Sequence, residues 1–141
     1  MSTPTVRRAE LSDSDALFSL AKAFATSFTV EGPAFESSLT ALLQSPDAFV
    51  AVASDSERVV GYVLGFDHYT FYANGRVAWV EEIMVSEDVR RRGLGRQLMA
   101  HFEQWARIRD SKLIALATRR AAPFYQSLGY DESATCFRKV L

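Results

Sequence analysis

Residues 76–118 hold a strand, a helix and a second strand in succession, and this unit constrains the fold more than any other part of the chain. The apolar segment "RVAWVEEIMV" (76–85) predicts the first strand, and "KLIALAT" (112–118) predicts the second. The helix between them has apolar residues at helical spacing, at Leu94, Leu98, Phe102 and Trp105. Two strands that flank a helix in this way become parallel neighbours through a right-handed crossover. We therefore expect a sheet whose core includes a parallel pair.

Segments on both sides of this unit add further strands and helices. In chain order we expect a strand (4–9), a helix (11–28), a second helix carrying Phe35, Leu39 and Leu42, two strands (47–54 and 58–66), an aromatic loop (68–75), a short helix (121–128) and a final strand (134–141). Ser12 and Asp15 stand at capping-box spacing near the start of the first helix. Together these elements predict an α/β fold, a mixed sheet flanked by helices, in one domain over residues 1–141.

The composition narrows the classes of function. The formal net charge is −1, so no overall basic field indicates binding to DNA or RNA. Cys136 is the only cysteine, which excludes an internal disulfide and a cysteine-built metal site, and two histidines, His68 and His101, are too few for a metal site. The chain has no signal-peptide pattern and no apolar run long enough to span a bilayer. We expect a cytoplasmic protein with no metal, no nucleic-acid partner and no membrane partner.

Four arginines gather where the central helix begins, namely Arg90, Arg91, Arg92 and Arg96. Cations are unfavourable there, because the unpaired N–H groups of a helix start carry a partial positive charge. An anion bound at the loop explains the arrangement, and Gly93 and Gly95 let such a ligand approach the backbone closely. The alternative is a basic turn that is simply exposed to solvent. The loop lacks the Gly-Lys-Ser/Thr of a P-loop, and it has Leu98 where a dinucleotide fingerprint needs a third glycine.

The segment "RRRGLG" (90–95) fits the signature Arg/Gln-x-x-Gly-x-Gly/Ala, which follows a strand and opens a helix. At these residues the chain resembles the GNAT superfamily of acetyl-CoA-dependent N-acetyltransferases. The segment "LATRRAAPFYQSLGY" (116–130) resembles a later strand–helix segment of the same superfamily, so the resemblance covers residues 76–130. It implies parallel core strands splayed around the acetyl-CoA arm. It also implies transfer of acetyl to a primary amine of a small molecule or peptide, by direct attack in a ternary complex.

The resemblance also assigns residues to the cosubstrate. Backbone N–H groups of residues 91–96 would hold the pyrophosphate of coenzyme A (CoA), and residues 83–85 would pair with its extended pantetheine arm. The backbone N–H of Val85 would then stabilise the oxyanion on the acetyl carbonyl. Thr118 stands where the superfamily often has Asn. The full set expected to bind acetyl-CoA is Ile83, Met84, Val85, Arg90, Arg91, Arg92, Gly93, Leu94, Gly95, Arg96, Thr118 and Phe124.

Three residues are candidates for the proton transfers that acetylation of an amine requires. The resemblance places Tyr125 where a hydroxyl can protonate the departing thiolate, and a buried tyrosine with a structural role is the alternative. Glu81 and Glu82 are adjacent on a strand, so they point to opposite faces and one of them should face the ligand cleft, although a bulge would reverse which one. A carboxylate there can accept the proton of the amine, whereas a solvated or salt-bridged carboxylate is the plainer alternative. We favour Glu81, because the resemblance places acidic residues there.

The resemblance predicts that the acceptor amine binds near the first helices and the loop before the central strand. Aromatic residues gather in these segments: Phe24, Phe28, Phe35, Tyr69, Phe71 and Tyr72. We expect Phe28, Tyr69 and Glu81 to contact the acceptor. The other carboxylates able to hold an ammonium group are Glu31, Glu36 and Asp67.

Two classes of function stay open. The first is the N-acetyltransferase, and the second is a non-catalytic module that binds CoA or acyl-CoA as a sensor or interaction domain. Tyr125 and a strand carboxylate are both present, which favours the enzyme. A different nucleotide at the arginine loop is a weaker third interpretation. The resemblance is also compatible with a homodimer that pairs through an edge strand or the C-terminal strand.

Overall fold

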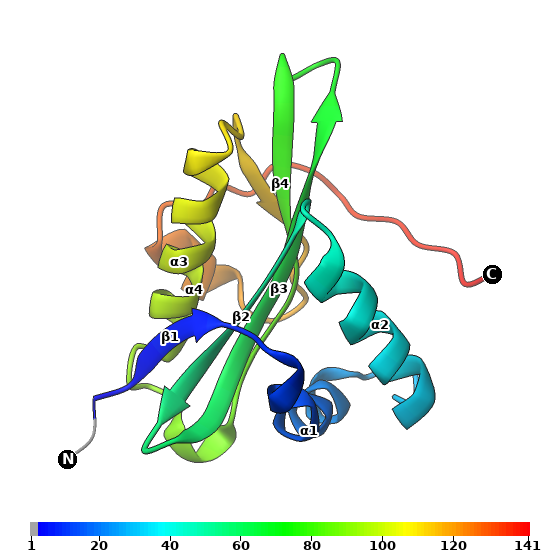
Figure 1. Cartoon of the computed structure of the whole chain (residues 1–141). Helices are drawn as coiled ribbons and strands as arrows, with labels where there is room; N and C mark the ends of the chain where they lie inside the picture. The colour runs from blue at the N-terminus through cyan, green and yellow to red at the C-terminus, as the bar shows by residue number, and fades with distance from the viewer. Residues whose placement is uncertain (1–2) are drawn as a thin grey trace.

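The computed structural model describes residues 3–141, and these form one five-stranded sheet in the order β1-β2-β3-β4-β5 (Figure 1). The strands are β1 (Thr5–Arg8), β2 (Ala48–Asp55), β3 (Arg58–Thr70), β4 (Gly75–Val85) and β5 (Ile114–Leu116). Neighbours from β1 to β4 are antiparallel, whereas β4 and β5 are parallel. The predicted mixed α/β architecture is confirmed, as is the parallel pair that flanks the central helix.

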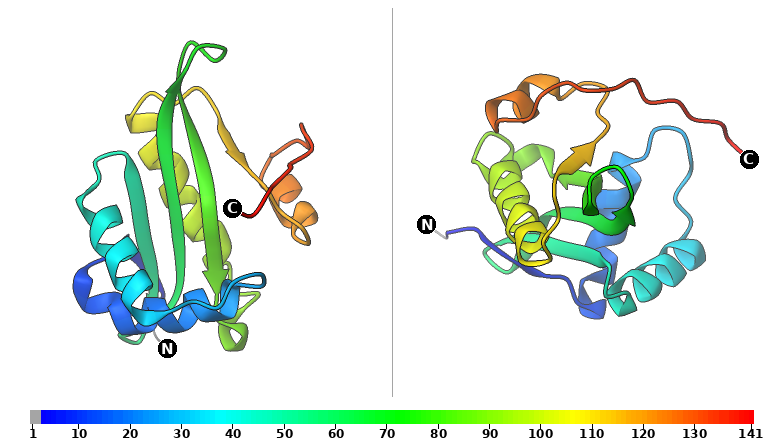
Figure 2. Two further views of the ribbon diagram at one scale, coloured as in Figure 1. Left: turned by 90° about the vertical axis from the view of Figure 1, so that its right-hand side faces the viewer. Right: turned by 90° about the horizontal axis from the view of Figure 1, so that it is seen from above.

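Helices cover both faces of the sheet (Figure 2). The helices α1 (Ser14–Phe24) and α2 (Gly32–Gln44) pack on one face, while α3 (Leu94–Ile108) packs on the other face beside the short α4 (Ala122–Ser127). Short 3-10 turns at Leu11–Asp13 and Glu87–Val89 precede α1 and α3. The predicted stripe of α3 is buried against the sheet, fully at Leu94, Leu98 and Phe102 and partly at Trp105.

The strands β4 and β5 separate soon after they meet. They pair over three residues each, from Ala78 to Val80 on β4 and from Ile114 to Leu116 on β5. From there β4 continues to Val85, paired with β3 on one edge, and within residues 3–141 no strand pairs with its other edge. The backbone groups on this open edge therefore lack the partners that a sheet normally supplies.

A bulge at Glu81 sets the directions of the side chains in the second half of β4. Residues 64 and 65 of β3 pair with Glu82 and Val80, which leaves Glu81 as the extra residue. The side chains of Val80 and Ile83 both pack with the cluster under α3, although three positions separate them. In a strand without a bulge, Glu82 rather than Ile83 would share the face of Val80. The bulge therefore keeps a carboxylate out of the apolar core and turns Glu82 toward α1 and α2.

The aromatic loop predicted over 68–75 is wrong. β3 runs on to Thr70 and β4 begins at Gly75, so only residues 71–74 form the turn. The predicted Asn-Gly turn signal does lie at this turn, where Asn74 has a φ of 63°. Aromatic residues are good strand formers, and pairing that places Tyr69 opposite Arg76 extends the hairpin beyond its predicted ends.

The first helix is shorter than predicted. α1 ends at Phe24, and residues 25–31 cross to α2 without helix or strand. The capping carboxylate is Asp13, which accepts the N–H of Glu10 at 2.8 Å, rather than the predicted pair of Ser12 and Asp15. Serine and β-branched residues in the segment "ATSFTVE" (25–31) have low helix propensity, which explains why α1 ends at Phe24.

The final strand predicted over 134–141 is also wrong. Residues 131–141 are exposed and have no regular structure. A strand needs a partner, and the neighbouring β5 offers an edge of only three residues. A homodimer through this segment stays a prediction.

Asp67 anchors the long hairpin to the end of α3. Its side chain is fully buried, and its Oδ1 accepts hydrogen bonds from Arg76 at 2.9 Å and from Arg109 at 2.9 Å. The Nε of Arg109 bonds the second oxygen, and both arginines also reach Asp47 at the start of β2. Three segments that are distant in sequence are thereby held together by two arginines and two carboxylates, of which Asp67 is the buried one.

We predict that Asp67→Asn lowers the free energy of unfolding by about 3 kcal/mol, because breaking a buried ion pair leaves its partners uncompensated. Urea unfolding followed by tryptophan fluorescence measures this. Asp110→Asn is the matched control, since Asp110 pairs with Lys112 at 3.1 Å on the surface and such pairs contribute about 0.5 kcal/mol. Equal losses in the two variants would contradict the anchoring role of Asp67.

Candidate active site

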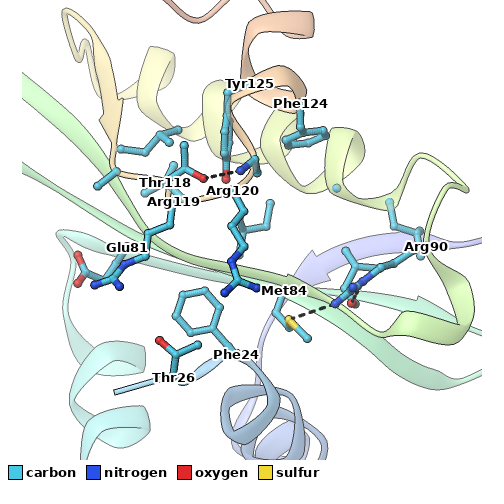
Figure 3. A pocket seen from close by; sticks show the side chains of 18 of the residues that line it. Phe24, Thr26, Glu81, Met84, Arg90, Thr118, Arg119, Arg120, Phe124 and Tyr125 are labelled. Atoms are coloured by element: carbon cyan, nitrogen blue, oxygen red, sulfur yellow. Dashed lines mark hydrogen bonds between the residues drawn. The ribbon is translucent and has the colours of Figure 1, made fainter. Parts of the chain in front are cut away.

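A cleft of about 1110 Å³ opens where β4 and β5 separate (Figure 3). Its walls are the connection from α1 to α2, the second half of β4, the loop that leads into α3, and the segment from β5 to α4. Most of the residues that the sequence assigned to acetyl-CoA line this cleft: Ile83, Met84, Val85, Arg90, Arg91, Gly93, Leu94, Gly95, Arg96, Thr118 and Phe124. Arg92 does not line it.

The loop before α3 is shaped to expose backbone N–H groups. Arg91 and Gly93 both adopt positive φ, at 69° and 80°, and Gly93 is the N-cap of α3. The first N–H groups of a helix have no partner within the helix, so they can bind an anion. Gly95 lies against Phe124 of α4, and a Cβ added at Gly95 would be 3.2 Å from that ring. A side chain at position 95 would therefore narrow the entrance between α3 and α4.

The four predicted arginines divide into two groups. Arg90, Arg91 and Arg96 line the cleft, whereas Arg92 pairs with Asp55 of β2 at 2.7 Å, outside it. Arg90 donates from Nε to the carbonyl oxygen of Val85 at 3.0 Å. This bond shows that the carbonyl of Val85 points to the open edge of β4. Because the N–H and C=O of one strand residue point to the same edge, the N–H of Val85 also faces the cleft.

Tyr125 presents its hydroxyl to the cleft from α4 (Figure 3). The residue is 7% exposed, and its ring packs edge-on against Phe124 with centroids 5.0 Å apart. The hydroxyl makes no hydrogen bond within residues 3–141, whereas the nearby Tyr130 donates to Glu103 at 2.6 Å. Burial raises the pKa of Tyr125, so its hydroxyl stays protonated well above neutral pH. Such a group can donate a proton.

The two adjacent glutamates face different spaces. Glu81, on the bulge, lines the cleft and accepts a hydrogen bond from Nε1 of Trp79 at 2.9 Å. Glu82 lies on the α1 and α2 side, where Tyr62 donates to its Oε1 at 2.7 Å. Burial and the neighbouring Glu82 carboxylate raise the pKa of Tyr62, so this hydroxyl remains a donor. The bulge thus leaves Glu81, rather than Glu82, in the lining of the cleft to which the loop and Tyr125 also contribute.

The residues expected to bind the acceptor are dispersed. Phe28 lies in the connection after α1 and lines the cleft. Tyr69 lies on the hairpin with its ring 4.3 Å from the guanidinium of Arg76, and it does not line the cleft. Asp67 is enclosed by the arginines described above, and Glu36 accepts a hydrogen bond from Ser14.

Thr118, which was predicted to bind acetyl-CoA, lines the cleft, and its hydroxyl accepts the N–H of Ala121 at 3.0 Å.

Three arginines that line the cleft were not assigned to it from the sequence: Arg119, Arg120 and Arg138. In Figure 3, Arg119 extends toward Glu81, and Arg120 extends between Phe24 and Met84. Arg138 belongs to the C-terminal segment and donates to Ser27 at 3.1 Å. The consecutive arginines after the strand 112–118 were a visible signal for the first pair, but the position of Arg138 depends on how the chain folds back.

Two negative findings apply to residues 3–141. No group of three or more His, Cys, Asp or Glu side chains is placed to hold a metal ion. No helix in this part of the chain is both long and apolar enough to cross a membrane.

The chain is similar to known proteins over most of its length. The model of the acetyltransferase (GNAT) family matches residues 15–130. Among solved structures, a transcriptional regulator from Bacillus halodurans C-125 has a TM-score of 0.89 at 21% identity, over 99% of this chain and 100% of that chain. Glucosamine-6-phosphate N-acetyltransferase from Arabidopsis thaliana has a TM-score of 0.88 at 16% identity, over 98% of each chain. A search of curated proteins finds no match.

A third similar structure is the aminoglycoside N-acetyltransferase AAC(6')-Iy, solved in complex with CoA. Its TM-score is 0.86 at 19% identity, over 99% of this chain and 96% of that chain. At these identities the structural matches establish the fold, whereas the family model spans most of the sequence. The chain therefore belongs to the GNAT family of acetyltransferases, which use acetyl-CoA.

Proposed function

We propose that this protein transfers an acetyl group from acetyl-CoA to a primary amine of a small molecule or peptide, by direct attack in a ternary complex. The convergence of three features in one cleft supports the proposal. These are the N–H-rich loop at the start of α3, the open edge of β4, and the presence in the lining of a hydroxyl and a carboxylate, those of Tyr125 and Glu81. An anion-binding loop alone would fit many ligands, but the open strand edge also suits an extended, amide-rich arm.

The loop and the strand edge would bind and orient the cosubstrate. The N–H groups at the start of α3, together with Arg90, Arg91 and Arg96, provide positive charge for the pyrophosphate. The edge from residue 83 to residue 85 offers backbone donors and acceptors to the pantetheine amides. The N–H of Val85 would then donate to the carbonyl oxygen as negative charge develops on it.

The reaction forms a C–N bond and breaks a C–S bond. An alkylamine has a pKa of about 10, so it is mostly protonated at neutral pH and must lose a proton to attack. Glu81 is the base in this proposal, acting directly or through water. Tyr125 donates its proton to the departing thiolate, for which its buried hydroxyl, with no hydrogen-bond partner among residues 3–141, is suited.

The alternative is a module that binds acyl-CoA without turning it over. It has support because the fold is shared with a protein described as a transcriptional regulator. Mass spectrometry of amine mixtures incubated with the protein and acetyl-CoA separates the two functions. Acetylated amine formed in proportion to protein is the expected result, and tight acetyl-CoA binding without any product would support the sensor instead.

We predict that Tyr125→Phe lowers kcat by about 100-fold, a typical effect of removing a positioned acid, and leaves the KM for acetyl-CoA nearly unchanged. Phe keeps the shape of the buried ring and removes a hydroxyl that makes no hydrogen bond within residues 3–141. Initial rates of CoA release at saturating amine measure the effect. Wild-type kcat in this variant would rule out Tyr125 as the acid.

We predict that Glu81→Gln changes the pH dependence of kcat/KM for the amine. Without a base, only the free amine can react, so the rate should climb with pH toward the amine pKa of about 10. The deficit relative to the wild type should therefore be largest near pH 6 to 7 and should narrow at alkaline pH. Glu57→Gln, in the exposed turn between β2 and β3, is the control. A deficit that is constant with pH would indicate that Glu81 has only a structural role.

A further inference from the structure

A second cavity, of about 420 Å³, lies between the sheet and the helices α1 and α2. Its walls are mainly apolar, and they include Leu17, Ala21, Phe35, Leu39, Leu42, Val50 and Leu64. Cavities of this size hold small ligands, and apolar walls favour an aliphatic or aromatic group. The catalytic proposal makes no use of this space.

The second cavity adjoins the cleft. Phe24, Ala25 and Phe28 line both spaces, so the connection after α1 is a shared wall. The two aromatic side chains on this wall are solvent-accessible, at 37% for Phe24 and 68% for Phe28. Aromatic surface left exposed between two cavities is suited to contact a ligand that reaches from one into the other.

The two spaces differ in charge. The lining of the cleft has six arginines and one glutamate: Arg90, Arg91, Arg96, Arg119, Arg120, Arg138 and Glu81. The lining of the second cavity has two glutamates, Glu31 and Glu82, and no lysine or arginine. The cleft therefore suits an anionic ligand, whereas the second cavity and its entrance favour a cation.

Glu82 is held in place for such a ligand. Tyr62, which is 3% exposed, donates to its Oε1, and within residues 3–141 the other carboxylate oxygen accepts no hydrogen bond. The bulge at Glu81 is what turns this carboxylate toward the second cavity. Each of the two adjoining spaces therefore has a carboxylate able to attract an amine, Glu81 in the cleft and Glu82 in the second cavity.

We propose that the second cavity binds the apolar tail of the acceptor, and that the acceptor is a primary amine with an aliphatic or aromatic tail. This inference rests on the proposed acetyltransferase function. The amino group would lie in the cleft with Glu81, and the tail would pass Phe24 and Phe28 into the second cavity. A longer acyl chain on CoA is the competing occupant, but it brings no amino group for Glu31 and Glu82 to attract.

The test compares ethylamine, butylamine, hexylamine and phenethylamine as acceptors with acetyl-CoA. Burial of each added methylene should raise kcat/KM by about two- to fourfold until the cavity is filled. Ala34→Trp should abolish this gain and leave the rate with ethylamine unchanged, because Ala34 lines the cavity from an exposed position on α2. Thr40→Trp is the matched control, since Thr40 is exposed on the same helix and does not line the cavity.

The outcomes separate the inference from the function on which it rests. A rise with tail length that is lost only in Ala34→Trp supports the inference. Equal rates for all four amines, or a rise that survives in Ala34→Trp, overturn it and leave the acetyltransferase function intact. A preference for hexanoyl-CoA over acetyl-CoA that Ala34→Trp removes assigns the cavity to the acyl chain and also overturns it. No acetylation of any amine refutes the proposed function itself.

Discussion

The separation of β4 and β5 after three paired residues is the constraint on which the site depends. Beyond this point no strand of the described part of the chain lies beside one edge of β4, and unpaired backbone groups away from water are costly. A ligand that offers amide groups in an extended chain can take the place of the missing strand. The parallel crossover through α3 brings the N–H-rich loop to the end of the same edge, so the anion site and the strand edge share one cleft.

The elements of the site could be predicted where the signal is local. The strand before the loop, the arginines and glycines at the helix start, and the position of Tyr125 all lie in short stretches of sequence. The bulge at Glu81 could not be predicted, because it depends on the register between β3 and β4. The position of Arg92 outside the cleft could not be predicted either, because it depends on Asp55, which is distant in sequence. The terminal strand was predicted wrongly because the apolar pattern of residues 134–141 does not show whether another strand is available to pair with them. The second cavity could not be predicted, because it arises from the packing of α1 and α2 on the sheet and no sequence motif marks it.

The bulge also directs the two adjacent glutamates into spaces whose linings differ in charge. It leaves Glu81 in the arginine-rich cleft and turns Glu82 to the mainly apolar second cavity. In the proposed complex the anionic cosubstrate would occupy the arginine-rich cleft, and the acceptor would reach the second cavity across the wall that the two spaces share. Local clusters of charge can attract charged ligands even though the formal net charge of the chain is only −1.

Calorimetric titration with acetyl-CoA tests the cofactor site most directly. We expect the wild type to bind, Gly95→Trp to lose binding, and Gln97→Trp to bind like the wild type. Position 95 faces Phe124 at the cleft, whereas Gln97 is exposed on α3 and does not line it. No heat of binding with the wild type, or equal binding by both tryptophan variants, would contradict the assignment of this loop to CoA.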